Sequence, residues 1–175
     1  MDSRVRESND SGVGSAVRAN DFFAVVHGEW FEWEAVSGSG GAMRLLPSSA
    51  QIAALPWVAE SVDDRGHLDV SHDEIERSLY VKPQCTFRGG GPFEVSGIKD
   101  AGGAWVRGAV PADSPGHTAL IYYDGEDRAW AEQQEGLEAY DVYSAMGYCV
   151  QGWVSLSELS DYREIVEERP IPGRS

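Results

Sequence analysis

Residues 29–36 alternate between apolar and polar side chains, and a second extended pattern follows at residues 42–46. Alternation places every second side chain on one face of a β-strand, so Phe31 and Trp33 would share a face and Trp30 would lie on the other. Five small residues, SGSGG, separate the two stretches. Glycine-rich residues between two extended runs are typical of a β-hairpin, and we predict one here.

The loop of this hairpin, residues 37–41, is long for a tight turn and carries almost no side chains. It fits two interpretations: a mobile turn, or a slim finger that enters a narrow cleft and offers its backbone N–H and C=O groups. Trp30 also has two possible interpretations. On an exposed face it would anchor a protein interface, whereas beneath another element it would belong to the core. Both pairs of alternatives stay open.

Three serine-led patterns predict helices. Ser48 or Ser49 is placed to cap a helix with Ile52, Leu55 and Val58 on one face. This helix must kink or restart at Pro56, because proline lacks an N–H.

The other two serine-led patterns are S-x-x-E capping boxes, at residues 71–74 and 155–158. The first predicts a helix that ends before Pro83. The second predicts a final helix, and residues 164–172 are either the end of that helix or a last edge strand. The apolar residues that these helices would bury are Ile75 and Leu79 in the first and Leu156 and Leu159 in the second.

The second half of the chain is rich in predicted strands, separated by Gly-, Asp- and Pro-containing turns. These strands cover residues 93–98, 104–110, 117–123 and 148–154, and one further strand is predicted at 22–27, before the hairpin. A helix is predicted at 126–137. Short links favour antiparallel pairing, since parallel crossovers need about a dozen residues or more. The predicted fold class is α+β: a twisted, mostly antiparallel sheet with helices packed on one face.

The first twenty residues are polar and small, without an apolar period, so we predict a disordered tail at 1–20 and a single α+β domain at 21–175. An apolar content of 42% suits a globular core. The beginning of the chain lacks the apolar stretch of a secretory signal, and the sequence has no apolar run of about 18 residues. We therefore expect a cytoplasmic protein without a membrane partner.

Acidic residues greatly outnumber basic ones, and the formal net charge is −15 at pH 7. Most of the excess comes from two segments: residues 124–168 hold twelve acids and two arginines, and residues 60–76 hold seven acids and one arginine. Such a surface repels nucleic-acid backbones and anionic lipid heads, and it favours a basic protein partner. The alternative explanation is solubility alone.

One short segment, "HLDVSHDE" at residues 67–74, groups side chains that could bind a metal. These are His67, Asp69, His72 and Asp73. Their spacing matches neither a structural Cys/His site nor a catalytic site with three ligands. A helix start at Ser71 is sufficient to explain the carboxylates, because the helix dipole favours anions in the first turn. We expect no metal and no cofactor.

No residue set in the chain spells out a reaction, because nucleophile-elbow, H-E-x-x-H and phosphate-loop motifs are absent. The glycine-rich segment 88–95 precedes a predicted strand, whereas a phosphate cradle precedes a helix. Cys85 and Cys149 are interpreted as two buried thiols of a reducing compartment. A distant pairing of either with His27 or His117 would instead make a Cys–His hydrolase.

Carboxylates and aromatic residues leave two more alternatives open. Paired carboxylates beside tryptophans would suit a hydrolase that acts on sugars, and an apolar pocket lined by tyrosines would suit a small-ligand binding module. The tryptophans concerned are Trp30, Trp33, Trp105, Trp130 and Trp153, and the tyrosines are Tyr122, Tyr123, Tyr140 and Tyr143. We expect a binding protein rather than an enzyme, because no nucleophile–base set emerges.

Three segments carry a resemblance to a known class: "GEWFEWEAVSGSGGAMRLL", "DGEDRAWAEQQ" and "GWVSLSELSDYREIVEERP". Small, acidic, tryptophan-rich and without a catalytic motif, the chain resembles the immunity proteins of bacterial polymorphic-toxin systems over roughly residues 21–169. It is similar in size and general character to the immunity factor of the tuberculosis necrotizing toxin. The resemblance implies a cytoplasmic antitoxin that binds one cognate NAD glycohydrolase toxin, blocks its active-site cleft and performs no catalysis itself.

For such a complex, the predicted contact surface combines an aromatic anchor, the hairpin tip and a rim of acids. Tight inhibitors of enzymes draw most of their binding energy from a few anchors, and surrounding charges speed association. The predicted contact residues are Trp30, Gly38, Ser39, Gly40, Gly41, Glu126, Asp127 and Glu132.

Overall fold

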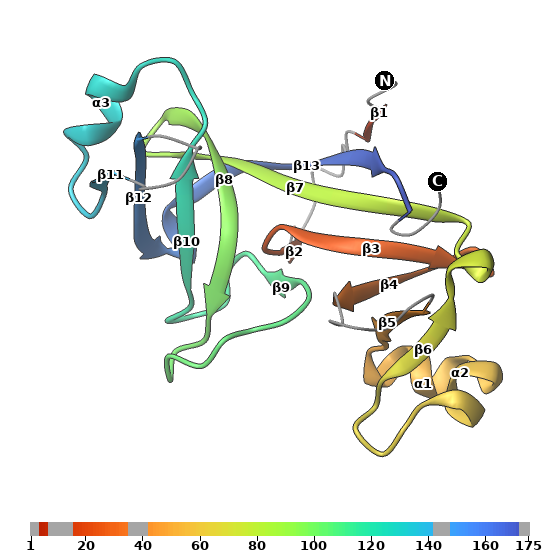
Figure 1. Ribbon diagram of the computed structural model, residues 1–175. Coiled ribbons are helices and arrows are strands. Elements are labelled where there is room, and N and C mark those ends of the chain that lie inside the picture. The colour runs from red at the N-terminus through yellow and green to blue at the C-terminus, as the bar shows by residue number, and fades with distance from the viewer. Residues whose placement is uncertain (1–3, 7–15, 35–41, 142–147, 172–175) are drawn as a thin grey trace. The chain divides into compact units, whose positions relative to one another are not determined.

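The computed structural model describes residues 4–6, 16–34, 42–141 and 148–171 (Figure 1). Contacts within the chain divide it into two compact units. The first unit is built mainly from Asp21–Val81, together with the chain from Val166 onward, and the second from Arg4–Asn20 and Lys82–Ile165. Two long strands, β7 (Arg77–Phe87) and β13 (Leu159–Arg169), contribute residues to both units.

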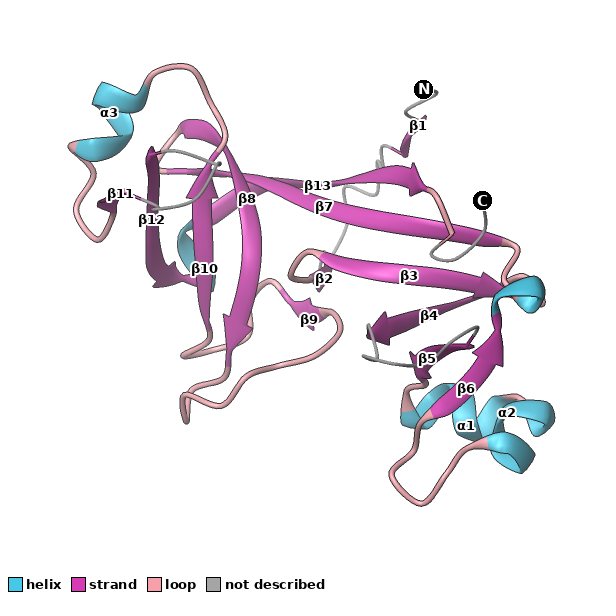
Figure 2. Cartoon of the chain, viewed as in Figure 1, coloured by secondary structure: helices cyan, strands magenta, loops and turns pink. Residues whose placement is uncertain are grey.

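The first unit is an antiparallel sheet in the order β7-β3-β4-β5-β6 (Figures 1 and 2). Its strands besides β7 are β3 (Asp21–Val26), β4 (Glu29–Glu34), β5 (Ala42–Leu46) and β6 (Leu68–Ser71). Two short helices, α1 (Ser49–Ala54) and α2 (Pro56–Ser61), follow β5, and a 3₁₀ turn, η1 (His72–Glu74), follows β6.

Both faces of this sheet bury apolar side chains. Phe31 and Leu45 belong to one cluster, against which Trp57 of α2 packs with its ring in edge contact with that of Phe31. Phe23 and Leu79 belong to a separate cluster. Because neighbouring residues of a strand point to opposite faces, β3 contributes side chains to both clusters.

The second unit is an antiparallel sheet in the order β11-β12-β10-β8-β7. Its strands besides β7 are β8 (Gly90–Lys99), β10 (Thr118–Tyr123), β11 (Glu138–Asp141) and β12 (Tyr148–Ser155). β2 (Ala16–Val17) pairs with β9 (Val110–Pro111), and β1 (Arg4–Arg6) pairs with β13. A one-turn helix, α3 (Arg128–Glu132), and a 3₁₀ turn, η2 (Leu156–Glu158), complete it. Its core includes the fully buried Phe87, Phe93, Ile98 and Ile121.

Several predicted elements are confirmed. β4 and β5 pair antiparallel as a hairpin, with Glu32 opposite Leu46, and Phe31 and Trp33 pack on the same cluster. The helix after Ser48 restarts at Pro56, as proline requires, and Ser48 caps it in a capping box. The strands predicted at 22–27, 93–98, 117–123 and 148–154 are β3, part of β8, β10 and β12. The sheet is mostly antiparallel, as predicted, but the helices are few and short.

The two helices predicted from capping boxes are wrong. Both boxes form, at Ser71 and Ser155, but each opens only a 3₁₀ turn, and the chain then enters β7 or β13. A capping box satisfies only the first backbone donors of a helix, so it sets a turn but does not decide the next element. Pro83 lies within β7, between the residues paired with β3, which end at Val81, and those paired with β8, which begin at Gln84.

Other elements are shorter or longer than predicted. In place of the strand predicted at 104–110, the structure has a β-bridge at Trp105 and the first residue of β9. The helix predicted at 126–137 is the five-residue α3. Residues 16–20, predicted as the end of a disordered tail, contain β2, and Val17 is buried in the core of the second unit. Among the described helices, none is long and apolar enough to cross a bilayer.

Candidate functional site

The predicted contact residues fall in different parts of the structure. Gly38, Ser39, Gly40 and Gly41 lie outside the described residues. Trp30 is half-buried: its ring packs on Phe23, with the ring centroids 5.9 Å apart, and its backbone oxygen accepts a hydrogen bond from Gln51 Nε2 at 2.7 Å. It lies on the face opposite Phe31, as the alternation predicts, but that face is partly covered by its own cluster.

The three predicted acids lie on and beside α3. Asp127 is the N-cap of this helix, because its carboxylate accepts a hydrogen bond from the Trp130 backbone N–H at 3.0 Å. Glu126 and Glu132 are exposed. Asp127 thus has a structural role that the sequence did not reveal, and the other two are free to act as surface charges.

Exposed aromatic side chains gather on one face of the second unit, and we call Trp105, Tyr140 and Trp153 the aromatic face. Their exposed fractions are 65%, 49% and 37%, high for rings of this size. Leu120 of β10 is paired with both Trp153 of β12 and Gly97 of β8, so these three positions share one side of the sheet.

Close packing fixes this arrangement around Gly97. A Cβ atom at Gly97 would lie 2.6 Å from Cζ3 of Trp105, so the indole covers the bare backbone there. The rings of Trp105 and Trp153 meet edge to face, with centroids 5.4 Å apart. The ammonium of Lys99 lies 5.0 Å and 4.4 Å from their respective centroids. The aromatic face therefore already holds one cation by its ring faces.

A hollow of about 360 Å³ opens beside Trp153, and we call it the Trp153 hollow. Strand β11 pairs with β12 so that Glu138 is opposite Gln151, and Gln151 shares a face with Trp153 two residues along. The lining residues are Leu120, Gly136, Glu138, Tyr140, Gln151, Gly152 and Trp153. The hollow combines apolar and aromatic walls with one carboxylate and one amide.

A polar network lies on β7 and its neighbours. Lys82 pairs with Asp124 at 2.6 Å and with Glu94 at 3.6 Å. Burial alone would lower the pKa of Lys82, but the hydrogen bond and charge of Asp124, with Glu94, outweigh it and raise that pKa. Gln84 is buried and links this network to Arg163, whose Nη2 donates to its Oε1 at 2.9 Å. The charges are mutually neutralised, as in a structural network.

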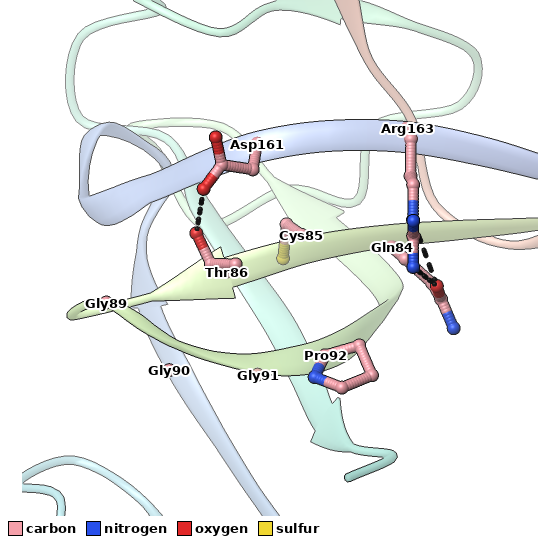
Figure 3. Close-up of a pocket in the computed structure, with 9 residues that line it drawn as sticks. All are labelled: Gln84, Cys85, Thr86, Gly89, Gly90, Gly91, Pro92, Asp161 and Arg163. Carbon is pink, nitrogen blue, oxygen red and sulfur yellow. Dashed lines mark hydrogen bonds between the residues drawn. The ribbon is translucent and has the colours of Figure 1, made fainter. Parts of the chain in front are cut away.

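A second hollow, of about 480 Å³, is formed by the β7–β8 turn and β13 (Figure 3). Thr86 donates a hydrogen bond to Asp161 at 2.9 Å across it. Cys85 lies beside this hollow, but its thiol donates to the backbone oxygen of Phe93 at 3.7 Å and is almost completely buried. Burial raises the pKa of Cys85 to about 12. Thiolate chemistry near neutral pH is therefore strongly disfavoured at this residue.

Cys85 is expected to react with a thiol reagent near pH 8 about a thousandfold more slowly than an unperturbed cysteine, because the raised pKa lowers its thiolate fraction by that factor. Mass spectrometry of a Cys149→Ser variant isolates the signal of Cys85. The labelling rate should rise about tenfold per pH unit until the pH approaches 12. Denatured protein is the control, and labelling at the same rate in the folded state would contradict this expectation.

The histidines, and the side chains of residues 67–74 that were considered as metal ligands, make separate local contacts. His27 packs on Trp57, with ring centroids 5.0 Å apart, and His117 Nδ1 lies 3.3 Å from the backbone oxygen of Pro115. Asp69 forms an ion pair with Arg44 at 2.9 Å, which lowers the pKa of that carboxyl through hydrogen bonding. Within the described part of the chain, no three His, Cys, Asp or Glu side chains are grouped to hold a metal ion.

The aromatic residues considered as a sugar platform or ligand pocket are also separated. Trp105 and Trp153 come together, whereas Trp130 packs against Phe93 and Tyr123 in the core. Of the four tyrosines, Tyr140 lines the Trp153 hollow, Tyr122 and Tyr123 are half-buried, and Tyr143 lies outside the described residues. The sequence named these aromatic residues but did not show that they gather, since Trp105 and Trp153 are 48 positions apart. They meet because Trp105 covers Gly97, and Gly97 and Trp153 are both opposite Leu120.

No protein-family model, curated protein sequence or solved structure matches this chain.

Proposed function

We propose that this chain is a cytoplasmic immunity protein that binds a cognate toxin one to one and blocks its active site, the toxin being an NAD glycohydrolase. The observation that carries the proposal is the aromatic face, three large rings left in contact with solvent on one side of the second unit. Clustered exposed tryptophan and tyrosine side chains are typical of protein interfaces, where they supply most of the binding energy.

The charge of the chain supports a basic partner. A net charge of −15 attracts cationic surfaces over distances comparable to the Debye length, and it speeds encounter more than it deepens affinity. The same charge opposes binding to nucleic acids and anionic membranes. Chemistry at Cys85 gains no support, because its thiol is buried and its pKa is raised.

The proposal is tested by purifying the tagged chain from its native host and assaying the NAD hydrolysis of the recovered partner. Hydrolysis should be suppressed in a one-to-one complex and should return when the two proteins are separated. A partner whose hydrolysis is unaffected by saturating amounts of this chain would contradict the proposal, as would turnover of NAD by this chain alone.

In the same complex, the double variant Trp105→Ala/Trp153→Ala is expected to dissociate about a hundredfold faster, because interface anchors act mainly on the dissociation rate. Surface-binding kinetics measure this directly. Trp30→Ala is the comparison: faster dissociation of this variant would support the predicted hairpin contact. A double variant that dissociates at the wild-type rate would remove the aromatic face from the interface.

A further inference from the structure

We propose that the Trp153 hollow receives an arginine side chain of the bound partner. This inference rests on the proposed function and names the chemical group that the aromatic face recognises. Three features of the hollow carry it: its aromatic walls, its single carboxylate and the charge of the chain around it.

The walls suit a flat cation. Tyr140 and Trp153 both line the hollow and both keep a large part of their rings exposed. A guanidinium group is planar and weakly hydrated, so it stacks on aromatic rings more readily than an ammonium group does. Leu120 adds an apolar contact for the methylene stem of an arginine. The volume of about 360 Å³ accommodates one side chain of this kind.

The carboxylate supplies the counter-charge. Glu138 is exposed at the hollow, and among the residues that the structure describes it makes no ion pair. Carboxylates bind guanidinium groups through two parallel hydrogen bonds, a geometry that lysine cannot reproduce. Gln151, opposite Glu138 in the strand register, offers an amide oxygen as a further acceptor.

Lys99 shows that these rings attract cations. Its ammonium lies over Trp153 and Trp105, so these rings accept a cation, and Lys99 is not among the residues that line the hollow. An acidic guest would instead meet Glu138 and the net charge of −15, and a second copy of this chain carries that same charge. Charge complementarity therefore selects a basic partner residue.

The test uses three blocked tripeptides, Gly-Arg-Gly, Gly-Lys-Gly and Gly-citrulline-Gly, titrated into the whole chain and followed by NMR. Citrulline keeps the shape of arginine without its charge. The arginine peptide should shift the indole N–H signal of Trp153 and the amide signals of Glu138 and Gln151 in a saturable way. Binding of the citrulline peptide should be at least about tenfold weaker, and that of the lysine peptide several-fold weaker.

Variants locate the binding. Glu138→Gln, which preserves size, should weaken binding of the arginine peptide about tenfold, and Trp153→Ala should weaken it to a similar degree. Glu60→Gln, at an exposed acid of α2 in the first unit, is the matched control and should change nothing. Retained dispersion of the NMR spectrum shows that each variant is folded.

Equal shifts from the arginine and citrulline peptides, or binding unaffected by Glu138→Gln, would overturn the arginine assignment. If the toxin complex still formed and suppressed NAD hydrolysis, the proposed function would stand without it. Conversely, arginine binding that depends on Glu138, in a chain that inhibits no toxin, would retain the arginine site and overturn the proposed function.

Discussion

Replacing Phe93 with alanine is expected to lower the free energy of unfolding by about 4 kcal/mol, because the substitution removes a fully buried ring and leaves a cavity. Phe93 lies in β8 at the centre of the second unit, paired with Cys85 on one side and Tyr123 on the other. Its ring meets those of Phe87, Tyr123 and Trp130 at centroid distances of 5.9, 5.1 and 6.2 Å. These rigid rings cannot easily move to fill the cavity that the substitution leaves.

Urea unfolding followed by far-UV circular dichroism measures the effect of Phe93→Ala. Trp105→Ala is the matched control, since Trp105 belongs to the same unit and is larger, but is 65% exposed. Its loss should cost about 1 kcal/mol or less. Similar losses for both variants would mean that Phe93 does not organise the core.

Phe93 also links the core to α3, the helix that Asp127 caps and Glu132 ends. Trp130 rests on Phe93 and covers Gly90 so closely that a Cβ there would clash with Cη2 of the indole. The helix has only one turn, so this contact and its cap position it more than helix propensity does. Acids on α3 therefore keep their places only while the core of the second unit is intact.

The sequence predicts strands of this fold better than helices. Alternation identified β4, and short apolar runs identified β3 and β10, because burial on sheet faces follows a period of two that is visible locally. The helices predicted after Ser71 and Ser155 were wrong, because the choice between helix and strand beyond each turn depends on pairing with distant segments. β7, for example, pairs with both β3 and β8. The amino-acid sequence of a strand does not by itself show which distant strands it pairs with.

The candidate site was also predicted only in part from the sequence. The sequence placed Trp30 on the face opposite Phe31 correctly, but it could not show that Phe23, from a neighbouring strand, covers part of its ring. It also singled out Trp105 and Trp153 without joining them. Their contact depends on a register in which both Gly97 and Trp153 are opposite Leu120, which only the assembled sheet defines.

Gly152→Ala is expected to lower the free energy of unfolding by about 3 kcal/mol, the upper end of typical overpacking costs. A Cβ at Gly152 would clash with the backbone oxygen of Gly136 and would lie 2.9 Å from Cδ2 of Leu137. The closest obstacle is backbone, so the segment that leads into β11 would have to move. Glu138 and Tyr140 lie on β11, and binding of the arginine peptide should therefore weaken together with stability.

Gly97→Ala provides the control, because the atom that its Cβ would meet, 2.6 Å away, belongs to the exposed side chain of Trp105. That ring can swing aside, so the cost in stability should be about 1 kcal/mol or less. Urea unfolding and the NMR titration are measured on both variants. Because a backbone obstacle cannot yield as a side chain can, equal stability losses at the two glycines would contradict this account of how β12 holds β11 beside the Trp153 hollow.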